Sequence, residues 1–219
     1  MKPRIKICCI GSIVEAKLAI RYGASAIGLV SEMPGGPGVI PEDLISRIAA
    51  NIPASISTFL LTSKQAAAAI IKQQKRCKVN TLQLCDRLVT GTYSNLREGL
   101  AGIKIAQVIH VTGEESVEEA ISVAPEVDAL LLDSGNTSSA VKELGGTGRT
   151  HDWKLSRKIV DSVDIPVWLA GGLNPDNIAD AIKTVKPYGV DVCSGVRTDS
   201  KLDEEKLQRF TDQVRMEGF

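Results

Sequence analysis

The sequence predicts one α/β domain, a (β/α)8 barrel that spans residues 1–219. Short runs of apolar, β-branched residues alternate along the whole chain with amphipathic helical stretches, and each alternation makes one strand–helix unit. Eight such units fit into this chain length, which is the number that the barrel needs. The strands are continuously apolar, which is typical of parallel strands buried on both faces.

The strand and helix patterns follow one another at nearly regular intervals. Strands are predicted over residues 5–10, 26–30, 55–61, 81–85, 104–111, 128–134, 165–172 and 189–196. Helices are predicted over residues 14–23, 41–52, 63–77, 92–100, 113–124, 152–163, 174–185 and 203–214. Ser63 suits the N-cap of the third helix. A doubly wound open sheet is the alternative, but "CCIGSIVEA" after the first strand lacks its glycine fingerprint.

Composition excludes several classes of protein. Lys+Arg and Asp+Glu both number 26, so we expect no nucleic-acid or anionic membrane partner, and any anion site must be local. The apolar runs are well short of the ~20 residues that a membrane helix needs. "MKPRIKICCI" is charged and does not resemble a signal peptide. Five cysteines, an odd number without a CxxC pair, predict reduced thiols in the cytoplasm and no metal site.

The C-terminal ends of the strands are where this fold places its chemistry. They bring Cys8 and Asp133 to opposite sides of the barrel mouth, where an acid and a base can act on neighbouring atoms of a small substrate. Candidate substrate-binding residues near the same ends are Lys6, Cys85, His110 and Asp191. Lys6 shares a strand face with Cys8, so it either favours the thiolate or packs in the barrel floor.

Two glycine-rich loops predict a phosphate site. "AGGLN" contains Gly171 and Gly172, and "CSGVR" contains Ser194 and Gly195. These segments follow the seventh and eighth strands, whose loops are the recurrent phosphate site of this fold. The alternative is that the glycines only serve tight turns. Because both loops carry the same signal, we favour phosphate binding.

The motifs "KICCI", "LLLDS", "GGTGRTHDW", "LAGGLNPDNI" and "GVDVCSGV" together resemble the phosphoribosylanthranilate isomerases of tryptophan biosynthesis. They occur in the family order and span nearly the whole chain. The resemblance implies a cofactor-free Amadori rearrangement of an aminoaldose phosphate to a ketose. It also implies that Cys8 is the general base at C2′, that Asp133 is the general acid to the ring oxygen, and that the two glycine loops hold the phosphate. Cys9 stands where the family usually has glycine, and strand alternation predicts that it points away from Cys8.

The sequence also departs from the family pattern. Gly38 stands where the family has an arginine that pairs with the anthranilate carboxylate, Cys85 replaces a histidine, and His110 replaces a lysine or arginine. Three functions therefore stay open: isomerisation of phosphoribosylanthranilate, isomerisation of a phosphosugar with another aglycone, and binding of a phosphorylated metabolite without catalysis. The presence of both Cys8 and Asp133 favours an enzyme. The partner expected in each case is a small phosphorylated sugar, and the sequence does not decide between a monomer and a homodimer.

Overall fold

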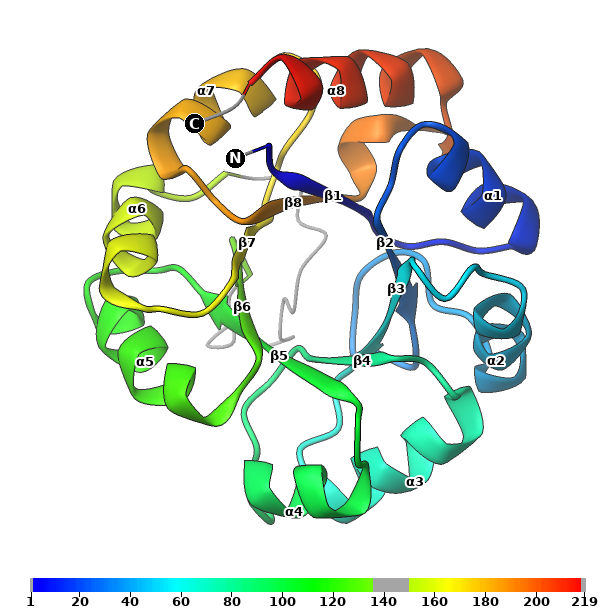
Figure 1. Cartoon of the computed structure of the whole chain (residues 1–219), viewed down its shortest axis with the longest axis vertical. Coiled ribbons are helices and arrows are strands. Elements are labelled where there is room, and N and C mark those ends of the chain that lie inside the picture. The colour runs from blue at the N-terminus through cyan, green and yellow to red at the C-terminus, as the bar shows by residue number, and fades with distance from the viewer. Residues whose placement is uncertain (1, 136–149, 218–219) are drawn as a thin grey trace.

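A computed structural model describes residues 2–135 and 150–217, and within these ranges eight parallel strands close into a barrel. Neighbouring strands pair in sequence order, and β8 pairs with β1 to complete the ring, as Figure 1 shows. The strands are β1 (Arg4–Ile7), β2 (Ala26–Val30), β3 (Ser57–Thr62), β4 (Thr81–Leu84), β5 (Lys104–His110), β6 (Ala129–Asp133), β7 (Val167–Leu169) and β8 (Gly189–Val192). The predicted (β/α)8 barrel is therefore confirmed.

The helices form an outer ring around the strands (Figure 1). They are α1 (Ile13–Arg21), α2 (Glu42–Ala50), α3 (Ala67–Cys77), α4 (Tyr93–Gly99), α5 (Glu115–Val123), α6 (Trp153–Ser162), α7 (Ile178–Val185) and α8 (Glu204–Met216). Two short 3-10 helices, η1 (Ala124–Glu126) and η2 (Ser194–Val196), and a small hairpin of β9 (Arg197–Thr198) and β10 (Lys201–Leu202) complete the described elements.

Side chains at the N-termini fix where several helices begin. Ser12, Thr92, Asp152 and Asp203 each accept hydrogen bonds from the first free backbone N–H groups of α1, α4, α6 and α8. The prediction that Ser63 caps the third helix is wrong, because α3 begins four residues later. The Ser63 hydroxyl instead donates to the carbonyl oxygen of Glu32, in the preceding βα loop.

Two apolar layers hold the barrel together. The larger one lies between the strands and the helices, and the smaller one fills the barrel interior. At the closed end of the interior, the rings of Phe59, Trp168 and Tyr188 stack edge to face, with centroids 5.8 and 5.6 Å apart. Gly189 makes this possible, since a Cβ there would lie 2.6 Å from the Trp168 ring. The aromatic floor leaves the polar side chains nearer to the other end of the barrel.

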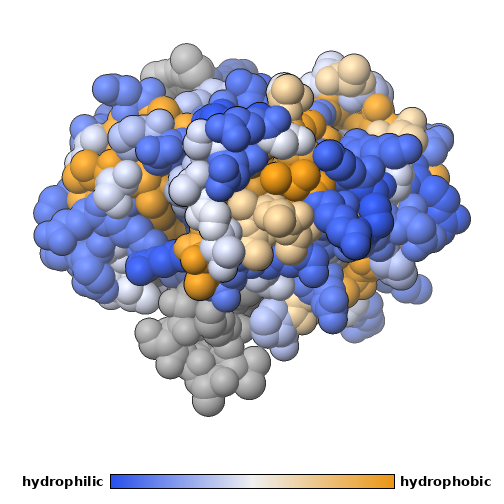
Figure 2. All heavy atoms as spheres, turned by 90° about the horizontal axis from the view of Figure 1, so that it is seen from below, coloured by the Kyte–Doolittle hydropathy of each residue, from blue (hydrophilic) through white to orange (hydrophobic). Residues whose placement is uncertain are grey.

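Polar side chains dominate the face seen in Figure 2, and apolar ones lie between them in small groups. Among the described residues, no helix is both long and apolar enough to cross a membrane.

Candidate active site

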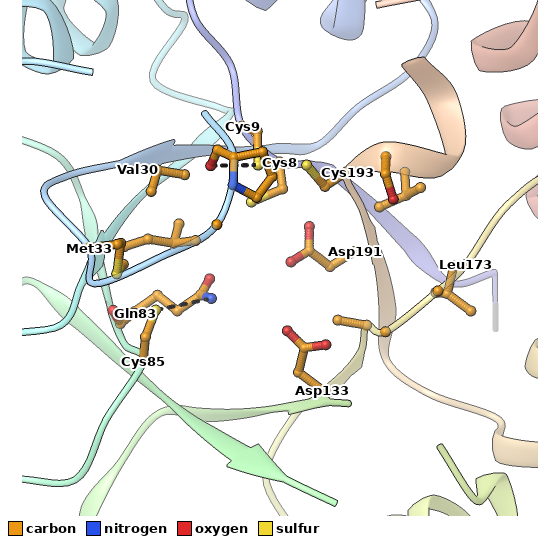
Figure 3. A pocket seen from close by; sticks show the side chains of 18 of the residues that line it. Cys8, Cys9, Val30, Met33, Gln83, Cys85, Asp133, Leu173, Asp191 and Cys193 are labelled. Atoms are coloured by element: carbon orange, nitrogen blue, oxygen red, sulfur yellow. Dashed lines mark hydrogen bonds between the residues drawn. The ribbon is translucent and has the colours of Figure 1, made fainter. Parts of the chain in front are cut away.

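The C-terminal ends of the strands enclose a cavity with an empty volume of about 680 Å³, including its opening to solvent. Cys8, directly after β1, and Asp133, at the end of β6, both line it, and Figure 3 shows them approaching from different sides with Asp191 between them. Both are almost fully buried, 6% and 8% exposed. The predicted residues in its wall are Cys8, Cys85, Asp133, Gly171, Gly172, Asp191 and Ser194. Lys6, His110 and Gly195 are not among the residues that line it.

A buried ion pair lies beneath the cavity. Lys6 and Asp191 face each other across the β1–β8 register, and the Lys6 ammonium donates to Asp191 Oδ2 at 2.6 Å and to Gln83 Oε1 at 2.9 Å. Burial lowers the pKa of Lys6, but the charge and hydrogen bond of Asp191 and the nearby Cys8 and Cys85 together more than offset this, so the pKa lies above its ordinary value. Lys6 therefore stays charged. The other Asp191 oxygen, Oδ1, is buried and has no hydrogen-bond partner among the described residues, so a hydroxyl in the cavity could donate to it.

The Cys8 thiol has a positive charge beside it and a space made for it. Lys6 Nζ lies 3.8 Å from Cys8 Sγ, so the ammonium is placed to stabilise a thiolate. Gly28 on the neighbouring strand provides the space, since a Cβ there would lie only 2.7 Å from the same sulfur. Lys6 therefore packs in the barrel interior and also contacts the candidate base, and its support of a thiolate stays a prediction.

Burial is the largest influence on the pKa of Asp133. It raises the pKa of this carboxyl from 3.8 to about 6, because a buried carboxylate loses its hydration. The Ser134 backbone N–H, which donates to Asp133 Oδ1 at 2.7 Å, and the nearby His110 partly oppose this shift. A carboxyl with a pKa close to neutrality can donate a proton and take it back, as a general acid must.

Cys85 and His110 lie beside the acid in different positions. Cys85 is fully buried in the cavity wall, where loss of hydration raises its pKa, so it stays a neutral thiol. His110 pairs with Asp133 in the β5–β6 register, and its Nε2 lies 3.0 Å from the Cys85 carbonyl oxygen. The structure therefore places His110 beside the acid and not in the cavity wall.

The two glycine loops meet at one side of the cavity. Gly171 and Gly172 have φ of +82° and +63°, the left-handed region in which glycine is favoured. A Cβ at Gly195 would lie 2.0 Å from the carbonyl oxygen of Leu173, so the loops after β7 and β8 touch only because this residue is glycine. Asn177 Nδ2 donates to the Gly172 carbonyl at 2.9 Å and anchors the first loop to the start of α7.

The prediction that Cys9 points away from Cys8 is wrong, because both side chains line the same cavity. Strand β1 ends at Ile7, so the alternation of the strand does not extend to Cys9. The backbone of Cys9 is left-handed, with φ of +59°, and its Sγ lies 3.7 Å from the Pro37 carbonyl oxygen. This conformation favours glycine, which gives a physical reason for the glycine that the family usually has here.

Arg197 is a site residue that the sequence analysis missed. Its guanidinium donates to the backbone carbonyls of Cys8 and Cys9, at 3.2 and 2.8 Å, and pairs with Glu15 at 3.0 Å. Its side chain is only 9% exposed. Arg197 thus ties the loop that carries Cys8 to the segment after η2. No local pattern predicts this contact, since residues 8 and 197 lie at opposite ends of the chain.

Gly38 belongs to the loop that covers Cys9, not to a position from which a side chain enters the cavity. Its φ is +80°, and a Cβ there would lie 2.5 Å from Cys9 Cβ. An arginine at this position would collide with Cys9. The loop that contains Gly38 therefore has a backbone conformation that suits glycine and leaves no space for an arginine side chain.

Gly38→Ala should destabilise the protein more than Gly102→Ala. Both glycines have φ of +80°, but nothing lies within 4 Å of a Cβ built at Gly102. The left-handed backbone alone should cost each variant about 1–2 kcal/mol, and overpacking against Cys9 should cost Gly38→Ala about 1–3 kcal/mol more. Urea unfolding of both variants measures the difference. Equal losses would contradict the close contact with Cys9.

Known proteins resemble this chain along nearly its whole length. Residues 45–213 match the family model described as N-(5'phosphoribosyl)anthranilate (PRA) isomerase. The enzyme of that name from Methanosarcina acetivorans is 31% identical over 98% of this chain and 94% of its own length. N-(5'-phosphoribosyl)anthranilate isomerase 2 from Methanosarcina mazei is 35% identical over 99% of this chain and 96% of its own.

Solved structures agree with the sequence comparisons. Phosphoribosyl anthranilate isomerase from Thermotoga maritima is 26% identical, with a TM-score of 0.81 over 98% of this chain and 99% of that one. A related structure holds reduced 1-(o-carboxyphenylamino)-1-deoxyribulose 5-phosphate, at 25% identity, a TM-score of 0.78 and the same coverage of both chains. The family match, the full-length relatives and the shared barrel all point one way: the chain belongs to the N-(5'-phosphoribosyl)anthranilate isomerase family.

Proposed function

We propose that this protein isomerises N-(5'-phosphoribosyl)anthranilate to the 1-amino-1-deoxyribulose phosphate by a cofactor-free Amadori rearrangement, a step of tryptophan biosynthesis. The observation that carries the proposal is the buried cavity that Cys8 and Asp133 share, in a chain of this family. Its compartment would be the cytoplasm, where the five free thiols stay reduced.

The reaction needs a general acid that donates one proton and a general base that removes another. Asp133 donates its proton to the ring oxygen while the bond from C1′ to that oxygen breaks, and the nitrogen lone pair forms the Schiff base. The Cys8 thiolate then removes the C2′ proton, and the electrons of that C–H bond form the enolamine double bond and neutralise the nitrogen. Tautomerisation of the enolamine gives the ketose. The buried Lys6 ammonium 3.8 Å from Cys8 Sγ supports the thiolate.

The remaining cavity residues would bind the rest of the substrate. Asp191 Oδ1, which has no partner among the described residues, would accept a hydrogen bond from a sugar hydroxyl. Gly171, Gly172 and Ser194 would hold the phosphate with backbone N–H groups and a hydroxyl. Gly195 would act indirectly, by letting the two loops touch.

One observation favours a second candidate, an isomerase of the same type whose substrate has a different aglycone. Among the described residues that line the cavity, none is arginine or lysine, so none of them offers a cation to the anthranilate carboxylate. A non-catalytic binding protein is less well supported, because it would not need a buried acid and, across the same cavity, a thiol with its own cation.

A fluorescence assay tests the proposed function. Isomerisation should abolish the anthranilate-like fluorescence of phosphoribosylanthranilate at a rate proportional to enzyme, and inorganic phosphate should compete. The carboxylate-free analogue N-(5'-phosphoribosyl)aniline, followed by product mass spectrometry, should match the anthranilate compound in kcat/KM within about tenfold. The reason is that none of the described cavity residues offers the carboxylate a charge-assisted bond of about 1.5–3 kcal/mol.

The outcomes separate the candidates. Conversion of the anthranilate compound establishes the first. Conversion of the aniline compound alone establishes the second, and conversion of neither would contradict both. A preference of about 100-fold or more for the anthranilate compound would show that a cation holds its carboxylate after all.

A further inference from the structure

Three thiols meet at one side of the barrel mouth, which is more than the proposed reaction uses. Cys8 and Cys9 follow β1, and Cys193 follows β8, the strand that pairs with β1. All three line the cavity, and Figure 3 shows them side by side. Cys9 and Cys193 also line a groove on the other side, next to α1, so these two lie between the cavity and the outer surface.

The Cys9 and Cys193 side chains are neighbours: both residues line the cavity and the groove, and Figure 3 shows the two thiols next to each other. The register that joins Ile7 to Val192 continues, because the Cys8 backbone N–H donates to the Val192 carbonyl at 2.8 Å. Neighbouring strands lie about 4.8 Å apart, and disulfides span Cα separations of about 4.4–6.8 Å. The register puts Cys8 opposite Cys193 and Cys9 one residue further on, so Cys193 lies near both thiols, and the Cys8→Ser and Cys9→Gly variants decide which of them it bonds.

Cys9 has a left-handed backbone, and its side chain packs against the loop of Pro37 and Gly38. Its Sγ lies 3.7 Å from the Pro37 carbonyl oxygen. Arg197 holds the Cys9 carbonyl oxygen at 2.8 Å, so the residue is fixed on its backbone side too. Cys193 is partly exposed, which gives a small oxidant access to one thiol of the pair.

We propose that Cys193 and Cys9 form a dithiol site that hydroperoxides oxidise to an intramolecular disulfide. Hydrogen peroxide is the simplest such oxidant. The Cys193 thiolate attacks one peroxide oxygen and the O–O bond breaks, which gives the Cys193 sulfenic acid and, after protonation, one water. The Cys9 sulfur then attacks Cys193 Sγ, and the hydroxyl leaves with the Cys9 thiol proton as a second water. Two thiols lose two electrons, and one peroxide gains them.

The charges around the pair suit these two roles. The hydrogen bond from Cys9 lowers the pKa of Cys193, burial opposes this, and the positive charge of Arg197 lowers it further. The same hydrogen bond, followed by the contact with Cys8, raises the pKa of Cys9. Cys193 is also the more exposed of the two residues, so we assign it as the attacking thiol and Cys9 as the thiol that resolves the sulfenic acid.

Mass spectrometry of the oxidised protein tests the proposal without depending on the isomerase reaction. After treatment with hydrogen peroxide and alkylation of the remaining thiols, tryptic peptides 7–17 and 184–197 should be joined. The joined species should weigh two hydrogen atoms less than the sum of the two peptides, with the alkyl group on Cys8 included. Dithiothreitol should separate them. Cys77 and Cys85, which are fully buried, are internal controls and should be alkylated only after unfolding.

Three variants identify the partners. Cys193→Ser and Cys9→Gly should abolish the cross-link, and glycine fits the left-handed backbone at position 9. Cys8→Ser, the matched control, should retain it. A cross-link that survives in Cys9→Gly would assign the bond to Cys8 and overturn the proposal. Conversion of Cys193 to the sulfinic acid with no cross-linked peptide would overturn it as well.

Discussion

Cys8→Ser is expected to lower kcat for phosphoribosylanthranilate by at least ~100-fold, at the lower end of what a positioned base contributes. Serine keeps the size of the side chain, and Gly28 still leaves room for it. What is lost is the thiol, because a serine hydroxyl beside Lys6 is a far weaker acid than a thiol and a poorer source of the anionic base. Steady-state fluorescence assays at saturating substrate measure the effect.

Cys9→Gly is the control for this experiment. Its activity should stay within a few-fold of wild type, since glycine suits φ of +59° and the proposed base is untouched. Reversed effects of the two variants would show that Cys9, which lines the same cavity, is the base.

Asp133→Asn should separate activity from stability. The amide cannot donate a proton to the ring oxygen, so kcat should fall by at least ~100-fold. In the wild type, kcat/KM should fall as the pH rises above about 6, because Asp133 of the substrate-free enzyme loses its proton there. The variant should lose this pH dependence. A wild-type kcat/KM that does not fall above about pH 6 would contradict the assignment of Asp133 as the general acid.

The same substitution should stabilise the protein above neutral pH. The pKa of Asp133 is raised from 3.8 to about 6 in the folded state, so the folded protein binds this proton more tightly than the unfolded chain does. The free energy of unfolding therefore falls as the pH rises from about 4 to about 6, and this contribution stays lost at higher pH. Asp133→Asn removes this loss in the free energy of unfolding, which is on the order of 1–3 kcal/mol. Its Tm at about pH 8 should exceed that of wild type, and a lower Tm would show that the carboxylate stabilises the fold.

The barrel could be predicted because each strand–helix unit carries its own hydrophobic pattern. The run at 26–30 became β2 with the same bounds, whereas the first, seventh and eighth strands end earlier than predicted. The last residues of these predicted strands, including Cys8 and Cys9, lie in loops instead. Contacts with residues distant in sequence, such as Arg197, fix the backbone there. Apolar patterning does not distinguish a strand end from a buried loop.

The groups in the cavity were harder to predict than the fold. The position of Lys6 relative to Cys8 followed from strand alternation, and its pairing with Asp191 needed only the closure of the barrel. The contacts of Arg197 with the Cys8 and Cys9 carbonyls join opposite ends of the chain through a loop. The left-handed Cys9 and its contact with Gly38 depend on backbone angles that the residue types do not reveal.

Single-turnover fluorescence with enzyme in excess over phosphoribosylanthranilate tests the central claim most directly, because it reports chemistry apart from product release. The wild type should consume the fluorescence in one exponential phase. The double variant Cys8→Ser/Asp133→Asn should bind the substrate but convert it at least ~100-fold more slowly, with losses that are less than additive because the acid and the base act together. A wild-type rate no faster than buffer, or a double variant as fast as wild type, would contradict the account.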